Sequence, residues 1–345
     1  MNVLLIGYYG RENIGDDLML SNLCRSLLKD NSIKITIAVH DVDKLKIASD
    51  IKNINLVKTS DKLSYVKAIF SADKVIWGGG TCFYDAGVQN NRGLYDLIKI
   101  GLLCKLFRTQ FIFMGVGIGY LSDNVKDAIV KILKLSNEIY FRDKESLELA
   151  RKLYTKGNFK LSGDLAFLND SYPIKDIIRS NNYISYSGVQ GYGDAKTIAE
   201  KLNIISKEYD KKIVFLPSHR GVIDDNDLHE KIAENLTCEF AISSPNSVDE
   251  YIDVLEKSYF HVGVRLHSVV LADVAGCPNV GIVYSPKVER YIRESGAEGC
   301  IRTIADIGSL TPSIISDIID EYVQPLVFID NQKRLCQEAI DNVFK

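Results

Sequence analysis

The chain has 345 residues, of which 46% are hydrophobic and 25% are charged, and its formal net charge is −3. This length suits two domains of ordinary size, each able to bury its own core. The slightly acidic balance argues against a protein that coats nucleic acid or anchors through a polybasic segment. Any anion that the protein binds must therefore be held by a local cluster of cations.

The sequence shows no sign of export or of membrane insertion. The N-terminal stretch MNVLLIGYYG lacks the basic start and the long apolar run of a signal peptide. No apolar run reaches the roughly 18 residues that a membrane span requires. The seven cysteines stand singly, without a C-x-x-C pair or a metal-ligand spacing, which indicates reduced thiols. We therefore expect a cytoplasmic protein.

In the first half of the chain, short apolar runs alternate with stretches of helical period, as in a parallel sheet covered by helices. Strands are predicted at 2–7, 34–39, 55–59, 74–79, 110–117, 138–143 and 159–164. Helices are predicted between them at 16–30, 62–72, 93–107, 123–136 and 143–156. Most of these strands end in Gly or Asp, at the carboxyl edge where open α/β sheets bind ligands.

The alternation pauses around residues 168–182, where Pro173 and a Ser/Asn cluster indicate a linker. It then restarts, with strands predicted at 183–188, 212–218, 240–245, 260–265 and 279–285, each followed by a helix. The last residues predict two helices separated near Pro325. We therefore predict an α/β fold of two doubly wound, Rossmann-like domains that face one another across a cleft. The predicted bounds are 1–170 for the N-terminal domain, 180–310 for the C-terminal domain, and 311–345 for C-terminal helices that could pack back on the first domain.

The first predicted strand opens into GYYGRENIGDDLML, in which Gly7, Gly10 and Gly15 let the backbone turn sharply near a ligand. Their spacing is not the G-x-G-x-x-G of a dinucleotide fold, so a nicotinamide site is not expected. Asn13 and Asp16 stand where this loop meets the helix. Asp16 either caps the helix or contacts a sugar hydroxyl and accepts its proton. Because an aspartate there is a poor partner for phosphate, we expect a neutral polar ligand at this end.

Two glycine-rich stretches, VIWGGGTCFYDAG and MGVGIGYL, predict tight turns, most of which are structural. In IYFRDKES, Arg142 emerges at a strand's carboxyl edge, and Asp143 is available to cap the next helix. Arg142 then either points into the cleft or pairs with a neighbouring surface acid. Asp164, in LSGDLAF, either caps a turn or orients Arg142 or a sugar hydroxyl. His219 and Arg220 follow a further strand and are expected to be solvated.

The stretch FHVGVRLHSVVLADVAG predicts a strand that turns directly into an apolar helix, with Arg265 and His267 at the junction. One strand further on, IVYSPK places Lys287 in the first turn of a helix, where a cation opposes the helix dipole. Together these three side chains and two helix starts predict an anion pocket with a titratable group inside it. The alternative is a satisfied core histidine beside unrelated surface cations.

The motifs GYYGRENIGDD, IWGGGTCFYDAG, GVGIG, YFRDKES, SGDLAF and VRLHSVVLADVAGCPNVGIVYSPKV together resemble the polysaccharide pyruvyl transferases. The resemblance runs from residue 3 to about 293, and its most specific part is Arg-Leu-His followed by Pro-Lys about twenty residues after the histidine. It implies a glycosyltransferase-B-like fold and the transfer of pyruvate from phosphoenolpyruvate to a glycan as a ketal, with release of phosphate. One departure is Asp17, which stands where the family more often has Glu.

By the family's pattern, the donor-site positions are Arg142, Arg265, His267 and Lys287, and the acidic positions near the cleft are Asp16 and Asp164. A bidentate arginine suits the donor's carboxylate, and a lysine suits its phosphate. The resemblance makes His267 the acid that protonates the enol carbon. We therefore predict His267 and Asp16 as catalytic, and as substrate-binding Arg142, Asp164, Arg265, Lys287 and Asn13. No metal or cofactor is expected, since phosphoenolpyruvate acts as a co-substrate.

Two functions of other classes stay open. A nucleotide-sugar-dependent glycosyltransferase of similar fold would need an acid for the ribose, and Glu289 is available for it. A non-catalytic glycan-binding protein would need no cluster of cations. The expected partners are phosphoenolpyruvate and a glycan or a lipid-linked oligosaccharide, and not nucleic acid. A lipid-linked acceptor would bring the enzyme into peripheral contact with the inner face of the membrane.

Overall fold

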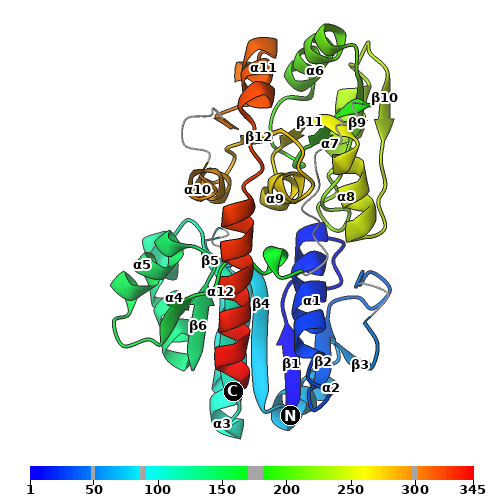
Figure 1. The fold of residues 1–345 in the computed structure, drawn as a ribbon. Helices are drawn as coiled ribbons and strands as arrows, with labels where there is room; N and C mark the ends of the chain where they lie inside the picture. Colours follow the sequence, from blue (N-terminus) through cyan, green and yellow to red (C-terminus); the bar gives the residue numbers. More distant parts are fainter. Residues whose placement is uncertain (48–50, 86, 88–90, 170–181, 297–301) are drawn as a thin grey trace. The chain divides into compact units, whose positions relative to one another are not determined.

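The computed structural model describes residues 1–47, 51–85, 87, 91–169, 182–296 and 302–345. These residues divide into two compact units (Figure 1). Unit 1 consists of Met1–Arg11, Asp16–Asn169 and Asp330–Lys345, and unit 2 consists of Glu12–Gly15 and Asp170–Ile329. Most of the predicted linker, residues 170–181, lies outside the described residues.

The sheet of unit 1 has seven strands, all parallel, in the order β3-β2-β1-β4-β5-β6-β7. The strands are β1 Asn2–Ile6, β2 Lys34–Val39, β3 Ile54–Lys58, β4 Lys74–Phe83, β5 Gln110–Ile118, β6 Glu138–Phe141 and β7 Phe159–Leu161. The chain order reverses between β1 and β4, which are neighbours in the sheet. Ligands of open α/β sheets bind at such a reversal, beyond the carboxyl ends of the strands.

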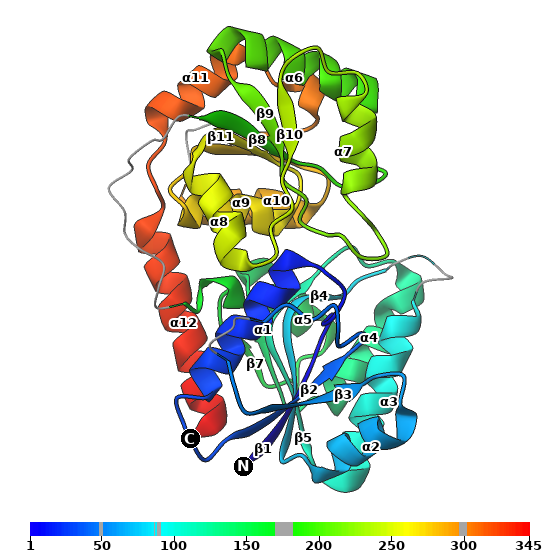
Figure 2. The same cartoon turned by 90° about the vertical axis from the view of Figure 1, so that its right-hand side faces the viewer.

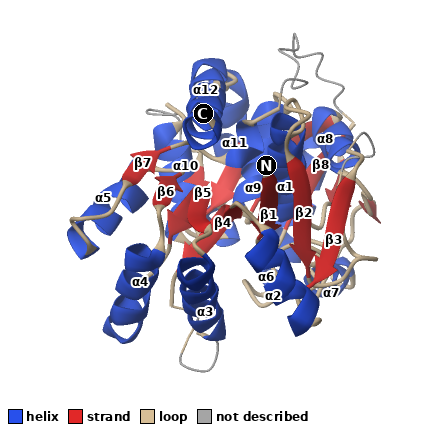
Figure 3. Cartoon of the chain, turned by 90° about the horizontal axis from the view of Figure 1, so that it is seen from below, coloured by secondary structure: helices blue, strands red, loops and turns tan. Residues whose placement is uncertain are grey.

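Helices cover both faces of this sheet. The helices α2, α3 and α4 lie on one face, and α1 and α12 lie on the other (Figure 3). The bounds are α1 Ile14–Leu27, α2 Lys62–Ser71, α3 Arg92–Phe107, α4 Asp123–Leu135, α5 Lys144–Leu153 and α12 Leu326–Phe344, with a short 3-10 turn, η1, at Leu165–Phe167. The last part of α12, from Asp330 onward, belongs to unit 1.

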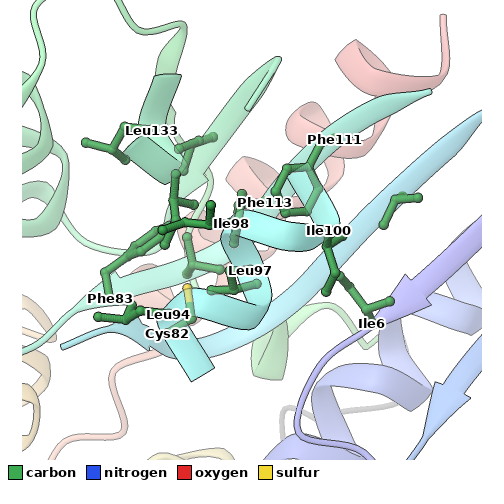
Figure 4. Close-up of a cluster of buried hydrophobic side chains, with 14 of the residues drawn as sticks. Ile6, Cys82, Phe83, Leu94, Leu97, Ile98, Ile100, Phe111, Phe113 and Leu133 are labelled. Atoms are coloured by element: carbon green, nitrogen blue, oxygen red, sulfur yellow. The ribbon is translucent and has the colours of Figure 1, made fainter. Parts of the chain in front are cut away.

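The core of unit 1 forms where α3 packs on the sheet (Figure 4). Leu94, Leu97 and Ile98 recur at helical spacing on the buried side of α3 and pack against aromatic side chains of β5 such as Phe113. Gly101 lies on the same helix, and a Cβ there would come within 2.9 Å of the Leu135 side chain. A glycine is therefore needed for α3 and α4 to pack this closely.

Unit 2 has a six-stranded parallel sheet in the order β10-β9-β8-β11-β12-β13. Its strands are β8 Tyr183–Ser187, β9 Lys212–Phe215, β10 Phe240–Ile242, β11 Ser258–Gly263, β12 Asn279–Ile282 and β13 Thr303–Ile304. Its helices are α6 Ala195–Tyr209, α7 Asn226–Ala233, α8 Val248–Glu256, α9 Leu266–Val274, α10 Pro286–Glu294 and α11 Pro312–Glu321, with a 3-10 turn, η2, at Ile307–Ser309. Helices α8, α9 and α10 lie on one face of the sheet, and α6 and α11 lie on the other (Figure 2). The strand order reverses between β8 and β11.

Both units are thus doubly wound parallel sheets, which confirms the predicted class of two Rossmann-like α/β domains. The glycine-rich stretch of β4 differs from the prediction. It is not a turn, because β4 continues through Gly79 and Gly80 to Phe83 and stays paired with β5. Both glycines have φ of +82°, a conformation that residues with a side chain rarely adopt. The C-terminal tail, predicted as one segment, is divided between the units, since α11 belongs to unit 2.

Candidate functional site

The seven predicted site residues fall into two groups, one in each unit. Unit 1 contains Asp16, Arg142 and Asp164, and unit 2 contains Asn13, Arg265, His267 and Lys287. In each unit, residues of the group follow the carboxyl ends of strands: Arg142 follows β6 in unit 1, and Arg265 and Lys287 follow β11 and β12 in unit 2.

Arg265 is the residue that precedes α9, and Val264 separates it from the end of β11. Its guanidinium forms a two-point ion pair with Asp225: Nε donates to Oδ2 at 2.8 Å, and Nη2 donates to Oδ1 at 2.6 Å. The Arg265 side chain is 16% exposed, whereas that of Asp225 is fully buried. Burial by itself would lower the pKa of Arg265, but the hydrogen bonds and charge of Asp225 outweigh it and raise that pKa.

Asp225 thus binds one edge of the planar Arg265 guanidinium, the edge formed by Nε and Nη2. The Nη1 nitrogen makes no hydrogen bond to any described residue, so the other edge can receive an anion. Asp225 also accepts the backbone N–H groups of Ser218 at 3.2 Å and His219 at 2.9 Å. A carboxylate with this many donors is fixed in place.

Sequence reasoning missed Asp225. It stands in the acidic run DDND at the start of α7, a composition typical of a solvated helix start, and nothing in that run distinguishes it from Asp224. Its partner Arg265 lies 40 residues further along the chain. The signal that could have found it is electrostatic, because a buried arginine at a strand end requires a buried acid.

His267, in the first turn of α9, packs against the backbone of Gly15. A Cβ on Gly15 would collide with Nδ1 of the imidazole, so only glycine fits at this position. The prediction for Gly15 was a close approach to a ligand, whereas the group that lies against it in the structure is the His267 side chain. Gly15 has no positive φ, so its role is to leave space.

The segment Glu12–Gly15 is built into unit 2 by backbone hydrogen bonds. Ile14 N donates to Ser218 O at 2.9 Å, and Arg220 N donates to Glu12 O at 3.0 Å. Asn13 pairs with His219 in an isolated β-bridge, and its Oδ1 accepts the N–H of Gly15 at 3.1 Å. His219 is 2% exposed, so the expectation that it is solvated is wrong.

Lys287 lies in the first turn of α10, after Ser285 and Pro286, as predicted. Its Nζ lies 5.4 Å from the centre of the Tyr284 ring, a cation–π contact. Tyr284 also contributes to the raised pKa of Arg265, which places the ring near both cations. Because β11 and β12 are adjacent and parallel, the helix starts that follow them share one edge. Unit 2 therefore presents Arg265, Lys287 and two helix N-termini together.

In unit 1, Arg142 follows β6 and is 7% exposed. Its Nη1 donates to Asp164 Oδ2 at 3.1 Å, and its Nη2 donates to the Thr81 hydroxyl at 3.0 Å. The alternative in which Arg142 pairs with a surface acid is wrong, because its partner Asp164 is buried. Asp143 caps α5 by accepting the N–H of Ser146 at 2.7 Å, as predicted.

Asp164 performs both of the roles considered for it. It accepts the N–H of Ala166 at 3.0 Å as the cap of η1, and it orients Arg142. Its own N–H donates to the side chain of Gln332 at 2.9 Å, so α12 supports the pair. The sequence offered no signal for Gln332, which lies 168 residues away.

Asp16 lies in the first turn of α1, which begins at Ile14, so Asp16 is not the residue that caps this helix. Its Oδ1 lies 3.4 Å from the point that a Cβ on Gly80 would occupy. Gly80 precedes Thr81, the residue that Arg142 contacts. Asp16 and Arg142 therefore both lie beside the same short stretch of β4, Gly80 and Thr81.

Among the residues that the structure describes, no three His, Cys, Asp or Glu side chains come together as metal ligands would. No described helix is long and apolar enough to cross a membrane.

The model of the polysaccharide pyruvyl transferase family matches residues 13–286, which confirms the resemblance seen in the motifs. No curated protein sequence is significantly similar to the chain. Solved structures of similar fold include three UDP-GlcNAc 2-epimerases. The epimerase from Rickettsia bellii has a TM-score of 0.66 and 13% sequence identity, and the match covers 99% of this chain and 95% of that chain. The epimerase from Neisseria meningitidis, bound to UDP-GlcNAc, has a TM-score of 0.58 and 13% identity, and the match covers 99% of both chains. The epimerase from Methanocaldococcus jannaschii, in complex with UDP-GlcNAc and UDP, has a TM-score of 0.60 and 12% identity, and the match covers 100% of both chains. At this identity the likeness shows the fold alone, which is glycosyltransferase-B-like.

Proposed function

The chain belongs to the polysaccharide pyruvyl transferase family, whose activity is pyruvyl transfer to a polysaccharide, and we propose that its donor is phosphoenolpyruvate and its product a ketal. The observation that carries this proposal is the group of Arg265, His267 and Lys287 at two neighbouring helix starts. Phosphoenolpyruvate has two anionic ends, a carboxylate and a phosphate. A site for it needs separate cations and has no need of a ribose-binding acid.

The two cations suit the two ends of this donor. The Nη1 edge of Arg265 is a planar fork held in place by Asp225, which suits the carboxylate. The ammonium of Lys287 is a point charge next to the N-terminus of α10, which suits the phosphate. In the free protein Lys287 opposes the helix dipole, and a bound dianion removes this cost.

His267 is proposed as the general acid. As imidazolium it protonates the methylene carbon of the enol, which leaves a cationic carbon that bears the carboxylate and the phosphate. One sugar hydroxyl adds to that carbon and loses its proton, and a second hydroxyl then displaces phosphate to close the ketal. Transfer of the proton by a positioned acid typically contributes about 10²–10⁴-fold to such a rate.

For the group in unit 1 we propose a role toward the acceptor glycan. Asp16 accepts the proton of an attacking hydroxyl, while Arg142 and Asp164 donate to and accept from sugar hydroxyls. Two contacts support a positioning role for Asp164 in particular, since Arg142 and the η1 backbone both bond to its carboxylate. Asn13 is proposed to bind substrate beside His267, because its segment is built into unit 2.

The direct test is to incubate the protein with phosphoenolpyruvate and candidate glycans. We expect mass spectrometry to show the added pyruvyl group and an equal amount of released phosphate. Lys287→Ala should raise the donor concentration required for half-maximal rate by at least tenfold. The matched control is Lys207→Ala, which removes a lysine from the last turn of α6. Equal loss in both variants, or no transfer with any glycan, would contradict the proposal.

A nucleotide-sugar-dependent activity is the second candidate, because solved relatives of this fold contain UDP or UDP-GlcNAc. Glu289, the acid available for a ribose, is exposed in the first turn of α10. Consumption of a UDP-sugar, with no phosphate released from phosphoenolpyruvate, would favour that activity. Glycan binding that is unaffected by His267→Gln, without turnover of either donor, would instead indicate a non-catalytic glycan-binding protein.

A further inference from the structure

Two neighbouring helices of unit 1 expose large apolar side chains to solvent. Six of the eighteen large hydrophobic residues that are exposed in the described part of the chain lie on α2 and α3. We call this set the α2–α3 apolar face, and its members are Leu63 (67% exposed), Val66 (36%), Phe70 (67%), Tyr95 (57%), Leu102 (47%) and Leu106 (72%). Exposed apolar patches of this kind mark interaction sites more often than they mark free surface.

The helical spacing places these side chains on the outer side of each helix. Tyr95, Leu102 and Leu106 on α3 are spaced by seven and four residues, so they form one stripe. The buried stripe of the same helix includes Leu97 and Cys104, which point to the sheet. Helix α3 therefore has a second apolar stripe that the core of unit 1 does not use.

The two helices form one continuous surface. The Phe70 ring on α2 meets the Phe107 ring on α3 edge to face, with centroids 5.2 Å apart. Helix α4 packs on the other side of α3, where Gly101 meets Leu135. All three helices lie on the same face of the seven-stranded sheet (Figure 3).

The charge of this surface opposes that of the whole chain. Helices α2, α3 and α4 carry eight Lys or Arg residues against three Asp, a net charge of +5, whereas the chain as a whole carries −3. Two of the three acids are each paired with a lysine of the same helix, Asp96 with Lys99 and Asp123 with Lys126. The apolar stripes are therefore flanked mainly by cations.

We propose that the α2–α3 apolar face binds the surface of an anionic lipid bilayer. Exposed Leu and Phe side chains enter the boundary between headgroups and acyl chains, while flanking lysines meet anionic headgroups, as in interfacial helices. A bilayer is favoured over a protein partner by charge complementarity, since the face combines a long apolar stripe with a positive rim in an otherwise acidic chain. The proposal is independent of the pyruvyl transfer reaction, because neither substrate takes part in it.

The test is flotation of the full-length protein with lipid vesicles. We expect binding to vesicles of phosphatidylglycerol and phosphatidylcholine, weaker binding at high salt, and little binding to phosphatidylcholine alone. The variant Leu63→Gln/Phe70→Gln/Leu106→Gln should lower the partition coefficient at least about tenfold. Lys67→Glu/Lys105→Glu should lower it by about fivefold or more for each charge.

Matched controls replace exposed residues of the same kinds elsewhere. Ile204→Gln/Val327→Gln removes two exposed apolar side chains, and Lys196→Glu/Lys207→Glu reverses two charges on α6. These controls should bind vesicles as the unchanged protein does, and all variants should keep their thermal unfolding midpoint. The proposal fails if the protein does not float with anionic vesicles, or if the face variants and the controls bind equally. It also fails if the face variants dissociate an oligomer in light scattering while vesicle binding is unchanged, since a second copy would then cover the face.

Discussion

Helix α9 has a buried arginine–aspartate pair at each end, and the two pairs differ in what else they bind. At its start, Arg265 pairs with Asp225 and remains 16% exposed. Near its end, Asp273 pairs with Arg302 at 2.6 Å, and their side chains are 0% and 3% exposed. Both pairs raise the pKa of their arginine against the effect of burial, through the same kind of partner.

The second pair is enclosed by further hydrogen bonds. The carboxylate of Asp273 accepts from the hydroxyls of Tyr291 at 2.7 Å and Tyr322 at 3.1 Å, and from Asn279 Nδ2 at 2.8 Å. Arg302 also donates to Asn279 Oδ1 at 2.9 Å. At the first pair, by contrast, Nη1 of the Arg265 guanidinium makes no hydrogen bond to a described residue. A buried pair whose donors are all satisfied has nothing left for a ligand, whereas a pair with a donor left over can bind one.

The largest expected effect is at the first turn of α9. His267→Gln keeps a polar side chain of similar reach but cannot deliver the proton, so turnover should fall by about 10²–10⁴-fold. Donor affinity should stay within a few fold, which steady-state rates combined with calorimetric titration of phosphoenolpyruvate would show. Normal turnover, or a loss caused only by failure to bind the donor, would remove His267 from the chemical step.

A stability effect of similar size is expected at the other end of the helix. Arg302→Met leaves the buried Asp273 carboxylate without its cation, and the free energy of unfolding should fall by about 3–5 kcal/mol. Urea denaturation measures this, and donor affinity of the folded protein should be unchanged. The double variant Arg302→Met/Asp273→Leu should recover part of the loss, because it removes the unpaired charge. If the single variant were as stable as the unchanged protein, the enclosed pair would have no structural role.

Arg265→Ala should show the reverse pattern. Donor affinity should fall by about 2–5 kcal/mol, as for truncation of one partner in a buried charge pair. The cost in stability should be smaller than for Arg302→Met, because backbone N–H groups still bind Asp225. Arg265→Lys should also bind the donor poorly, because an ammonium lacks the two planar edges by which a guanidinium contacts Asp225 and the donor's carboxylate at the same time. Unchanged donor affinity in both variants would contradict the assigned role.

The smallest effect concerns pH and a histidine beside the first pair. Burial lowers the pKa of His229 to about 4, and the charges of Asp225 and Arg265 act on it in opposite directions. An unfolded histidine has a pKa of about 6.5, so the unfolded state gains the proton first as pH falls. The contribution of the neutral His229 to the free energy of unfolding is therefore fully present above pH 6.5 and is lost progressively toward pH 4.

In His229→Gln, the fall in the free energy of unfolding between neutral and acid pH should be smaller by roughly 1–3 kcal/mol. Glutamine can still accept the N–H of Gly188, which the His229 Nε2 accepts at 3.0 Å, so stability at neutral pH should change little. Denaturation at pH 7 and pH 4.5 would measure the difference, with the exposed His40→Gln as control. The same acid sensitivity in both variants would show that His229 does not titrate in this window.

Much of the scaffold follows from local pattern. The alternation of apolar runs and helical periods predicted most strands and helices near their observed bounds, because side-chain periodicity reports which face of an element is buried. It also located Arg265, His267 and Lys287 at helix starts, since strand and helix signals meet at those residues. The stretch through Gly79 and Gly80 was an exception, because glycine indicates a turn unless its neighbouring strands are known.

The sequence by itself determined the fold class, the family and the chemical character of the candidate site residues. Only the tertiary structure decided their partners: Asp225 for Arg265, Gln332 for Asp164, and Gly15 as the surface against which His267 packs. The reason is that strand order sets which loops meet at the carboxyl edge of a sheet, and strand order depends on packing between distant segments. A local pattern can place a charge at that edge, but the partner that compensates it comes from elsewhere in the chain.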